Sequence, residues 1–253
     1  MQHEFVSLTV SNHIATITFN HPPVNAMNVQ AYNEMSEAFE SVSKNPEVRC
    51  VVLRAEGKGF IGGNDIGEID GHRRDNHAAY QAIVGRCGSA ILNCPVPVIG
   101  AVQGYAIGVG VVLALACDLV VCSTKAWFKL PEVSLGMVAG TSFVMRALPE
   151  KLVKYMCLTG RRLSGADLKV YGAVNEVVEP DELMKSVTEL ANEIAAQPPK
   201  TVRAFLDWYR KCDGHQTERN FDLETVYTGL LLETDERREC LKAFHEKRPA
   251  NFD

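Results

Sequence analysis

GFIGGNDI (residues 59–66) and GYAIGVG (residues 104–110) are the two stretches that decide the fold of this chain. Each is a glycine-rich turn, and the second leads directly into the apolar run VVLALA (residues 111–116). Glycine lets the backbone approach a ligand closely, and the first N–H groups of a helix favour negative charge. Two such N–H donors that point at one oxygen make an oxyanion hole. The pair of turns therefore indicates a site that stabilises an enolate.

One acid follows the two turns, Glu132 in the sequence LPEV (residues 130–133). A carboxylate next to an oxyanion hole can move protons. Its apolar neighbours Leu130, Val133 and Val109 would desolvate it and raise its pKa, which suits a base that must also return its proton. A solvated carboxylate at the start of a helix is the alternative for an isolated acid in a Pro-Glu turn. The two glycine turns upstream favour the catalytic interpretation.

Composition excludes several classes of protein. The chain has 253 residues, 46% of them hydrophobic, which allows a sizeable core. Its formal net charge of −5 gives no overall attraction to nucleic acid or to an anionic membrane. No apolar stretch reaches the ~18 residues expected of a membrane-spanning helix, and the first residues do not form a signal peptide. We therefore expect neither a nucleic-acid nor a membrane partner.

The eight cysteines predict free thiols and no metal site. None forms a Cys-x-x-Cys pair, no histidine lies at zinc-ligand spacing from them, and several lie within apolar runs. Free, buried cysteines are typical of a reducing compartment. We expect a cytoplasmic protein, and a mitochondrial matrix protein that has lost its transit peptide is the alternative.

The first half of the chain alternates strands with helices. A hairpin is expected at 5–10 and 14–19, a helix capped by Asn28, and a strand at 48–54 that is buried on both faces. Further strands are expected at 96–102 and 119–122, with helices at 80–91 and from 109 on. Beyond residue 142 the pattern becomes helical, with candidate helices at 142–158, 164–172, 181–197, 199–212, 217–233 and 234–246, one short strand at 174–178, and Ser164 and Asp181 as caps.

Gln197-Pro198-Pro199 is the best internal boundary. It divides the chain into a mixed α/β core at residues 1–197 and a helical region at residues 198–253. Apolar faces in the second part, around Trp208 and Leu231, need a partner, which is either this core or another subunit.

Five pieces of sequence, in this order, resemble the crotonase superfamily, which contains the enoyl-CoA hydratases and isomerases. The resemblance runs nearly from end to end. The pieces are NHPPVNAM (20–27), the Phe-x-x-Gly-x-Asp turn at 60–65, VIGAVQGYA (98–106), LPEVSLG (130–136) and AFHEKRPANF (243–252), in which Asn251 lengthens the final spacing.

This resemblance implies a spiral α/β core of ββα turns, a C-terminal helical region that forms a homotrimer or a dimer of trimers and covers the active site, and an acyl-CoA thioester as substrate. It implies no separate cofactor, because coenzyme A is part of the substrate. Matched by motif, the oxyanion hole is formed by the amides of Gly62 and Val109, and Glu132 is the catalytic acid–base. The positions that would contact coenzyme A or the acyl group are Val24, Phe60, Gly62, Gly63, Asn64, Asp65, Ile66, Gly108, Val109, Val112 and Lys247.

Two positions depart from the family pattern. Val109 stands where glycine is usual, which keeps the N–H donor but either crowds the acyl pocket or strains the turn. Val112 stands where a typical hydratase has a first glutamate, so that only Glu132 remains of the two acids. Isomerases of one subgroup are similar in using a single glutamate, which removes an α-proton and returns it at the γ-carbon. Other isomerases and the aryl-CoA dehalogenases have an acid near the position of Val138, but Met137-Val138-Ala139 contains none, which argues against both classes.

We therefore expect an acyl-CoA enzyme in which Glu132 shifts a double bond. Water addition by an enoyl-CoA hydratase is the alternative, and a non-catalytic acyl-CoA-binding member is a second. Asp65 is expected to cap its own loop. His21, His72 and His77 fall on predicted loops and are expected at the surface, as are Lys58 and Lys247, although either lysine could meet the phosphates of coenzyme A.

Overall fold

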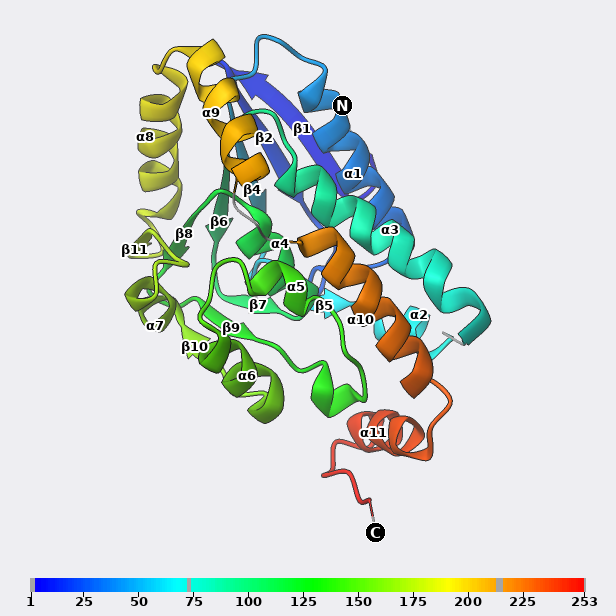
Figure 1. The fold of residues 1–253 in the computed structure, drawn as a ribbon. Coiled ribbons are helices and arrows are strands. Elements are labelled where there is room, and N and C mark those ends of the chain that lie inside the picture. Colours follow the sequence, from blue (N-terminus) through cyan, green and yellow to red (C-terminus); the bar gives the residue numbers. More distant parts are fainter. Residues whose placement is uncertain (1–2, 72–73, 213–215, 253) are drawn as a thin grey trace.

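A six-stranded sheet forms the centre of the computed structural model, which describes residues 3–71, 74–212 and 216–252 (Figure 1). β1 pairs with β2 in antiparallel fashion, and each of the following neighbours is parallel. The strands in spatial order are β1 (Val6–Ser11), β2 (Ile14–Phe19), β4 (Cys50–Ala55), β6 (Val98–Val102), β8 (Leu119–Ser123) and β11 (Glu176–Val178).

Short strands form a second layer. β4, β6 and β8 are each followed along the chain by a short strand outside the main sheet, namely β5 (Gly63–Asn64), β7 (Tyr105–Ile107) and β9 (Trp127–Lys129). β5 pairs with β3 (Ala26–Met27), and β9 lies between β7 and β10 (Leu163–Ser164). Helix α2 (Ile66–Asp70) follows β5 and helix α4 (Val109–Ala116) follows β7, so that ββα turns repeat along the chain. This confirms the expected crotonase-like spiral.

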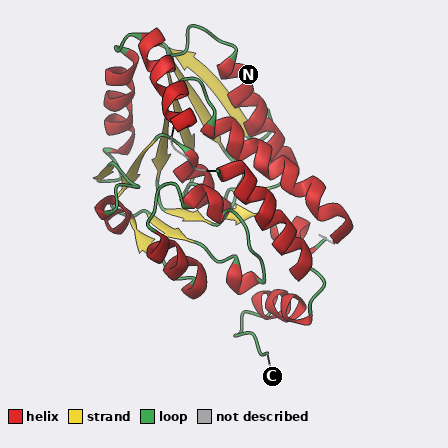
Figure 2. Cartoon of the chain, in the orientation of Figure 1, coloured by secondary structure: helices red, strands yellow, loops and turns green. Residues whose placement is uncertain are grey.

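Helices cover both faces of the main sheet (Figures 1 and 2). On one face, α8 (Leu183–Ala195) packs its Val187 and Ala191 against Val52 and Ile99. On the other face, α1 (Val29–Ser43), α3 (Arg74–Leu92) and α4 enclose the larger core. Residues of β4 alternate between the two cores, so this strand is buried on both faces as expected.

Local signals explain several boundaries. Asn28 caps α1, because its side chain accepts a hydrogen bond from the Ala31 N–H at 2.7 Å. Ser164 forms a capping box with Asp167 at the start of α7 (Gly165–Val170). Asp181, in contrast, was expected to be a cap and is not: α8 begins after Glu182, which makes no side-chain cap bond.

The expected helix at 142–158 is two helices. α5 (Thr141–Val144) ends early, and α6 (Glu150–Thr159) begins directly after Pro149. Proline has no N–H to donate and fixes its own φ, so it starts a helix readily but interrupts one that is already running.

Three helices follow the proposed boundary at residue 197. α9 (Pro199–Cys212) exposes Phe205, Trp208 and Tyr209. α10 (Thr217–Leu231) packs against α3 and α5, and α11 (Asp235–His245) packs against a short 3-10 turn, η1 (Val133–Leu135). The last two helices thus contact the core of their own chain close to Glu132.

Candidate active site

The two glycine turns lie side by side. The Phe60 N–H donates to the Tyr105 carbonyl at 2.8 Å, and the Ile107 N–H donates to the Ile61 carbonyl at 3.0 Å. A Cβ on Gly110 would come within 2.3 Å of the Ile61 oxygen. Real Cβ atoms do not approach a carbonyl so closely, so glycine at 110 is what allows α4 to start beside the first turn.

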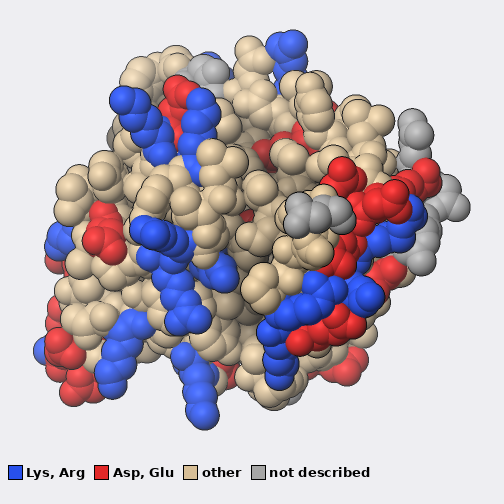
Figure 3. Space-filling model, turned by 90° about the horizontal axis from the view of Figure 1, so that it is seen from below, with Lys and Arg blue, Asp and Glu red and all other residues tan. Residues whose placement is uncertain are grey.

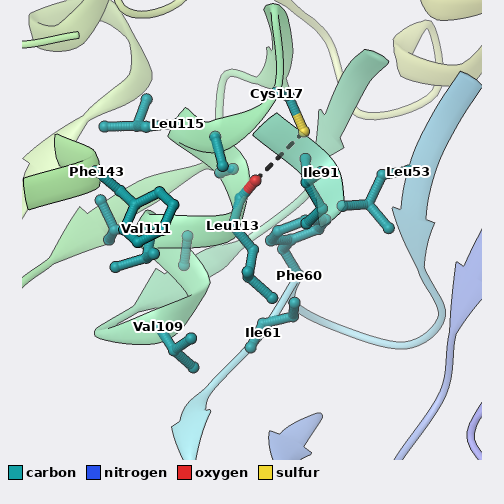
Figure 4. Close-up of a cluster of buried hydrophobic side chains, with 14 of the residues drawn as sticks. Leu53, Phe60, Ile61, Ile91, Val109, Val111, Leu113, Leu115, Cys117 and Phe143 are labelled. Carbon is teal, nitrogen blue, oxygen red and sulfur yellow. Dashed lines mark hydrogen bonds between the residues drawn. The ribbon is translucent and has the colours of Figure 1, made fainter. Parts of the chain in front are cut away.

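The start of α4 presents an unpaired helix amide. Val109 is the first residue of the helix, so its N–H is one of the four that find no acceptor within their own helix. Gly108 precedes it with φ 55° and ψ −117°, a conformation that requires glycine. The Gly108 N–H donates to the Lys129 carbonyl at 2.8 Å, which ties this turn to β9. Farther along α4, Val111 and Leu113 are buried in the same core as Phe60, Ile61 and Phe143 (Figure 4).

A cavity of about 740 Å³ opens at these turns. Its wall comes from both glycine turns, from β9, from the segment that carries Glu132, from α2 and α6, and from α11 with the residues after it. Among the residues expected to bind substrate, those in the wall are Gly62, Gly63, Asn64, Ile66, Gly108, Val109 and Glu132.

Gly62 differs from Val109 in the state of its amide. Its N–H donates to the Asn25 carbonyl at 3.1 Å, at the edge of the β3–β5 pair. A ligand oxygen would therefore have to share or replace that bond. Gly62 also lacks room for a side chain, because a Cβ would lie 2.4 Å from the Val24 carbonyl oxygen. The role of both amides as an oxyanion hole stays a prediction.

Glu132 lies immediately before η1 and directs its carboxylate inward. A Cβ on Gly108 would be only 2.7 Å from Glu132 Oε1. Oε2 is buried and has no hydrogen-bond partner among the described residues. Burial, together with a smaller effect of the nearby Glu224 carboxylate on α10, raises the pKa of Glu132 to about 8. A carboxyl with such a pKa is poised to accept and return a proton near neutral pH.

Val112 leaves Glu132 without a partner acid. A Cβ on Gly140 would lie 2.5 Å from Val112 Cγ2, so the valine packs directly against the Gly140 backbone. Val112 and Glu132 line a small apolar space of about 20 Å³ behind the main cavity. Glu132 is the single acid in the walls of these two spaces, as far as the described residues show.

Besides Val112, which lines only the small space, four of the expected binding residues lie outside the cavity wall. Phe60 is fully buried in the core, and Val24 is exposed beside Gly62. Asp65 caps α2, because its side chain accepts from the Gly67 N–H at 2.8 Å. Lys247 is exposed just after α11, next to Arg248, which does line the cavity. Contact between these four residues and a substrate stays a prediction.

The expectation for the histidines was wrong at one position. His77 is buried within α3 and is only 3% exposed, because α10 packs over this part of the helix. Burial lowers its pKa. His21 is half-buried, and its Nδ1 lies 2.7 Å from the Ala26 carbonyl oxygen. His72 lies outside the described residues.

Basic and aromatic residues in the cavity wall were not found from the sequence. Trp127 and Lys129 come from β9, and the Arg162 guanidinium stacks over the Trp127 ring at 3.9 Å. Lys and Arg side chains are numerous on the face of the molecule seen from below (Figure 3). A basic residue on a strand edge gives no local sequence signal, because it looks like any solvated lysine or arginine.

Other kinds of site find no support in the described part of the chain. No three or more His, Cys, Asp or Glu side chains are grouped there as a metal ion would need. None of the helices described has both the length and the apolar character needed to cross a bilayer. The eight cysteines all lie in described segments and are free thiols.

Comparison with known proteins agrees with this geometry. The family model for enoyl-CoA hydratase/isomerase matches residues 9–253. The chain is 34% identical to (E)-benzylidenesuccinyl-CoA hydratase of Thauera aromatica over 255 residues, which cover 98% of each protein. It is 33% identical to (7aS)-7a-methyl-1,5-dioxo-2,3,5,6,7,7a-hexahydro-1H-indene-carboxyl-CoA hydrolase of Mycobacterium tuberculosis, over 92% of this chain and 96% of the relative. The crystal structure of an enoyl-CoA hydratase/isomerase from Pseudoalteromonas atlantica superposes with a TM-score of 0.88 at 27% identity, covering 99% of this chain and 100% of the other.

Proposed function

We propose that this chain, which belongs to the enoyl-CoA hydratase/isomerase family, is an enzyme that shifts a double bond in an acyl-CoA thioester with Glu132 as its only acid–base. The observation that carries the proposal is the buried carboxylate of Glu132, which has a pKa of about 8. Among the described residues, no other acid lines the main cavity or the small space next to Val112. One carboxylate can carry one proton between two carbons, whereas hydration generally needs a second group to position and deprotonate water.

The proposed reaction has two proton transfers. In a 3-enoyl-CoA, the Glu132 carboxylate removes a proton from the α-carbon, and the electron pair moves into the thioester to form a dienolate. The protonated Glu132 then returns the proton to the γ-carbon, which leaves a 2-enoyl-CoA and a free carboxylate. The negative oxygen of the intermediate would be held by the Val109 N–H and by the Gly62 N–H once it leaves the Asn25 carbonyl.

The cavity suits a thioester of coenzyme A. Lys129 and Arg162 in its wall supply positive charge for phosphates. Arg248 also lies in the wall but is paired with Glu239 and Glu246. Ile69, Leu135 and Met137 form an apolar cluster in its wall, which suits an acyl group. These groups support the proposal without defining the acyl chain.

The decisive experiment compares the wild type with Glu132→Gln on a panel of 2-enoyl- and 3-enoyl-CoA thioesters, with identification of products. The amide keeps the shape of the side chain but cannot take a proton. Turnover should fall by about 10²–10⁴-fold, while affinity for a saturated acyl-CoA stays within a few-fold. In deuterated water, part of the original α-proton should appear at the γ-carbon. Near-normal turnover by Glu132→Gln on the best substrate would overturn the proposal.

Hydration is the second candidate, and the similarity to (E)-benzylidenesuccinyl-CoA hydratase supports it. It requires that the substrate or another residue position the water. The same panel distinguishes the two, because hydration yields a 3-hydroxyacyl-CoA and isomerisation yields none.

We also infer that the protein is a homotrimer or a dimer of trimers. The support is the apolar face of α9, where Phe205, Trp208 and Tyr209 are 55%, 59% and 53% exposed. Rings that contact each other and remain this exposed on one chain suit burial against another subunit. Light scattering that gives a monomer at micromolar concentration would contradict this inference.

A further inference from the structure

Three polar side chains of the C-terminal helices hold the segment that follows Glu132. On α10, the Glu224 carboxylate accepts from the Ser142 N–H at 2.7 Å. One turn later on α10, the Thr228 hydroxyl accepts from the Val138 N–H at 3.0 Å and donates to the Val138 carbonyl. On α11, Arg237 Nη1 donates to the Leu135 carbonyl. These bonds link segments about 80–100 residues apart to peptide groups near Glu132.

Arg237 makes the most direct of these connections. The Leu135 N–H donates to the Glu132 carbonyl at 3.0 Å, so the residue whose carbonyl Arg237 binds is itself bonded back to Glu132 through its N–H. Gly136 packs against the same side chain, since a Cβ at position 136 would lie 3.0 Å from Arg237 Cδ. The φ angle of Gly136 is 68°. Two hydrogen bonds of Leu135 therefore connect the Arg237 guanidinium to the backbone of Glu132.

Packing alone does not explain an arginine at this position. Arg237 is only 2% exposed, yet among the described residues its Nε and Nη2 have no hydrogen-bond acceptor. Burying a cation with incomplete hydrogen bonding costs free energy. Burial lowers its pKa, and the Asp70 carboxylate nearby opposes that effect. An apolar side chain of similar size would fill the space without this cost, so the bond to Leu135 is the feature that needs a guanidinium.

The same helix forms part of the acyl-CoA cavity. Cys240, Ala243 and Phe244 line the cavity, and they follow Arg237 at spacings that place all four residues on one side of α11. A ligand that contacts this side of α11 therefore contacts the helix that holds Arg237 against Leu135.

We propose that Arg237 is a positioning residue that couples occupation of the acyl-CoA cavity to the placement of Glu132. An acyl-CoA packs against α11, and α11 in turn holds Arg237 against Leu135 and Gly136. The turn that follows Glu132 then becomes ordered around the carboxylate. Arg237 does not touch the reacting atoms. The role assigned to Glu132 rests on the proposed function, whereas the coupling itself is a property of binding.

Hydrogen exchange of residues 133–138 with and without a saturated acyl-CoA tests the coupling without any turnover. In the wild type, the ligand should slow exchange of this segment at least tenfold. In Arg237→Gln, the ligand should still bind within about threefold of wild-type affinity, but the slowing should fall to less than threefold. With the reactive substrate, kcat should fall at least tenfold while KM changes less than threefold, and Arg237→Lys should recover part of kcat.

The matched control is Arg238→Gln. Arg238 is the next residue on α11, is exposed and pairs with Asp235 on the surface, so its loss should leave exchange and kcat unchanged. If Arg237→Gln does not fold, Arg237→Met fills the buried space without a hydrogen-bond donor, and the slowing at 133–138 should again fall to less than threefold. Wild-type exchange in either folded variant would overturn the proposal. Because the exchange experiment uses an unreactive ligand, that failure is separate from normal turnover by Glu132→Gln, which would overturn only the proposed chemistry.

Discussion

The carboxylate of Glu132 packs against the α-carbon of Gly108, so closely that a Cβ at position 108 would lie 2.7 Å from Glu132 Oε1. Gly108, which directly precedes the first residue of α4, therefore also borders the side chain of the proposed catalytic base. This contact joins the second glycine turn to the segment that carries Glu132.

Gly108→Ala should therefore damage catalysis more than its backbone strain explains. A non-glycine residue at φ 55° costs on the order of 1–3 kcal/mol, and the methyl group would also displace Glu132. We expect a fall in kcat of about 100-fold, measured on the best substrate at saturating concentration. Gly172→Ala is the control, because Gly172 has φ 77° and no atom within 4 Å of an added Cβ. It should lose similar stability and keep its kcat. Equal effects of both substitutions on kcat would show that the contact with Glu132 is irrelevant.

The pH dependence follows from the buried carboxyl. Burial raises the pKa of Glu132 to about 8, so the acid is mostly protonated at pH 6 and cannot accept a proton. For isomerisation, kcat/KM should rise by about tenfold per pH unit below the pKa and level off above it, because the free enzyme must start as a carboxylate. The measurement is kcat/KM from pH 5.5 to 9.5. A profile that is flat between pH 5.5 and 8 would mean that Glu132 is already ionised at pH 5.5 or is not the base.

Much of the core could be predicted from the sequence because its signals are local. The 5–19 hairpin, the Asn28 cap and the two-sided burial of the 48–54 strand depend on residues close together in the chain. Pro149 was visible in the sequence too, but the apolar spacing around it favoured one helix at 142–158. In the structure the chain forms two helices there, because proline interrupts the backbone hydrogen bonds of a helix.

The site could be predicted only in part, because its parts meet through long-range contacts. The glycine turns and Glu132 were found by their residue types, but the bond between the Ile107 N–H and the Ile61 carbonyl has no signature in either turn. His77 looked like a surface histidine because nothing nearby shows that α10 will cover it. Arg237 was likewise invisible, since a charged residue on a polar helix is normally solvated.

Val112→Glu should introduce hydration. Val112 and Glu132 line the same small space, so a carboxylate at 112 would face the existing acid and could hold a water between them. Its contact with Gly140 means that the longer side chain must turn toward the cavity. We expect formation of 3-hydroxyacyl-CoA from a 2-enoyl-CoA at a rate at least tenfold above the wild type. Val112→Gln has the same length without the acid and should show no gain. An equal gain in both variants would indicate that space, and not the second carboxylate, had limited water addition.

Val109→Pro tests the oxyanion hole by deleting a single donor. Proline replaces the N–H of Val109, and the first position of a helix is where proline is best tolerated, because that N–H makes no bond within the helix. If the Val109 N–H holds the enolate oxygen, its loss should cost about 3 kcal/mol of transition-state stabilisation, or 10²–10³-fold in kcat. Val109→Ala keeps the N–H and removes only the bulk, so it should retain kcat within a few-fold. Thermal unfolding of both variants checks that α4 still forms. If Val109→Pro folds normally and keeps the kcat of Val109→Ala, the Val109 amide is not a donor to the enolate, and the Gly62 amide would have to leave the Asn25 carbonyl and bind the oxygen alone.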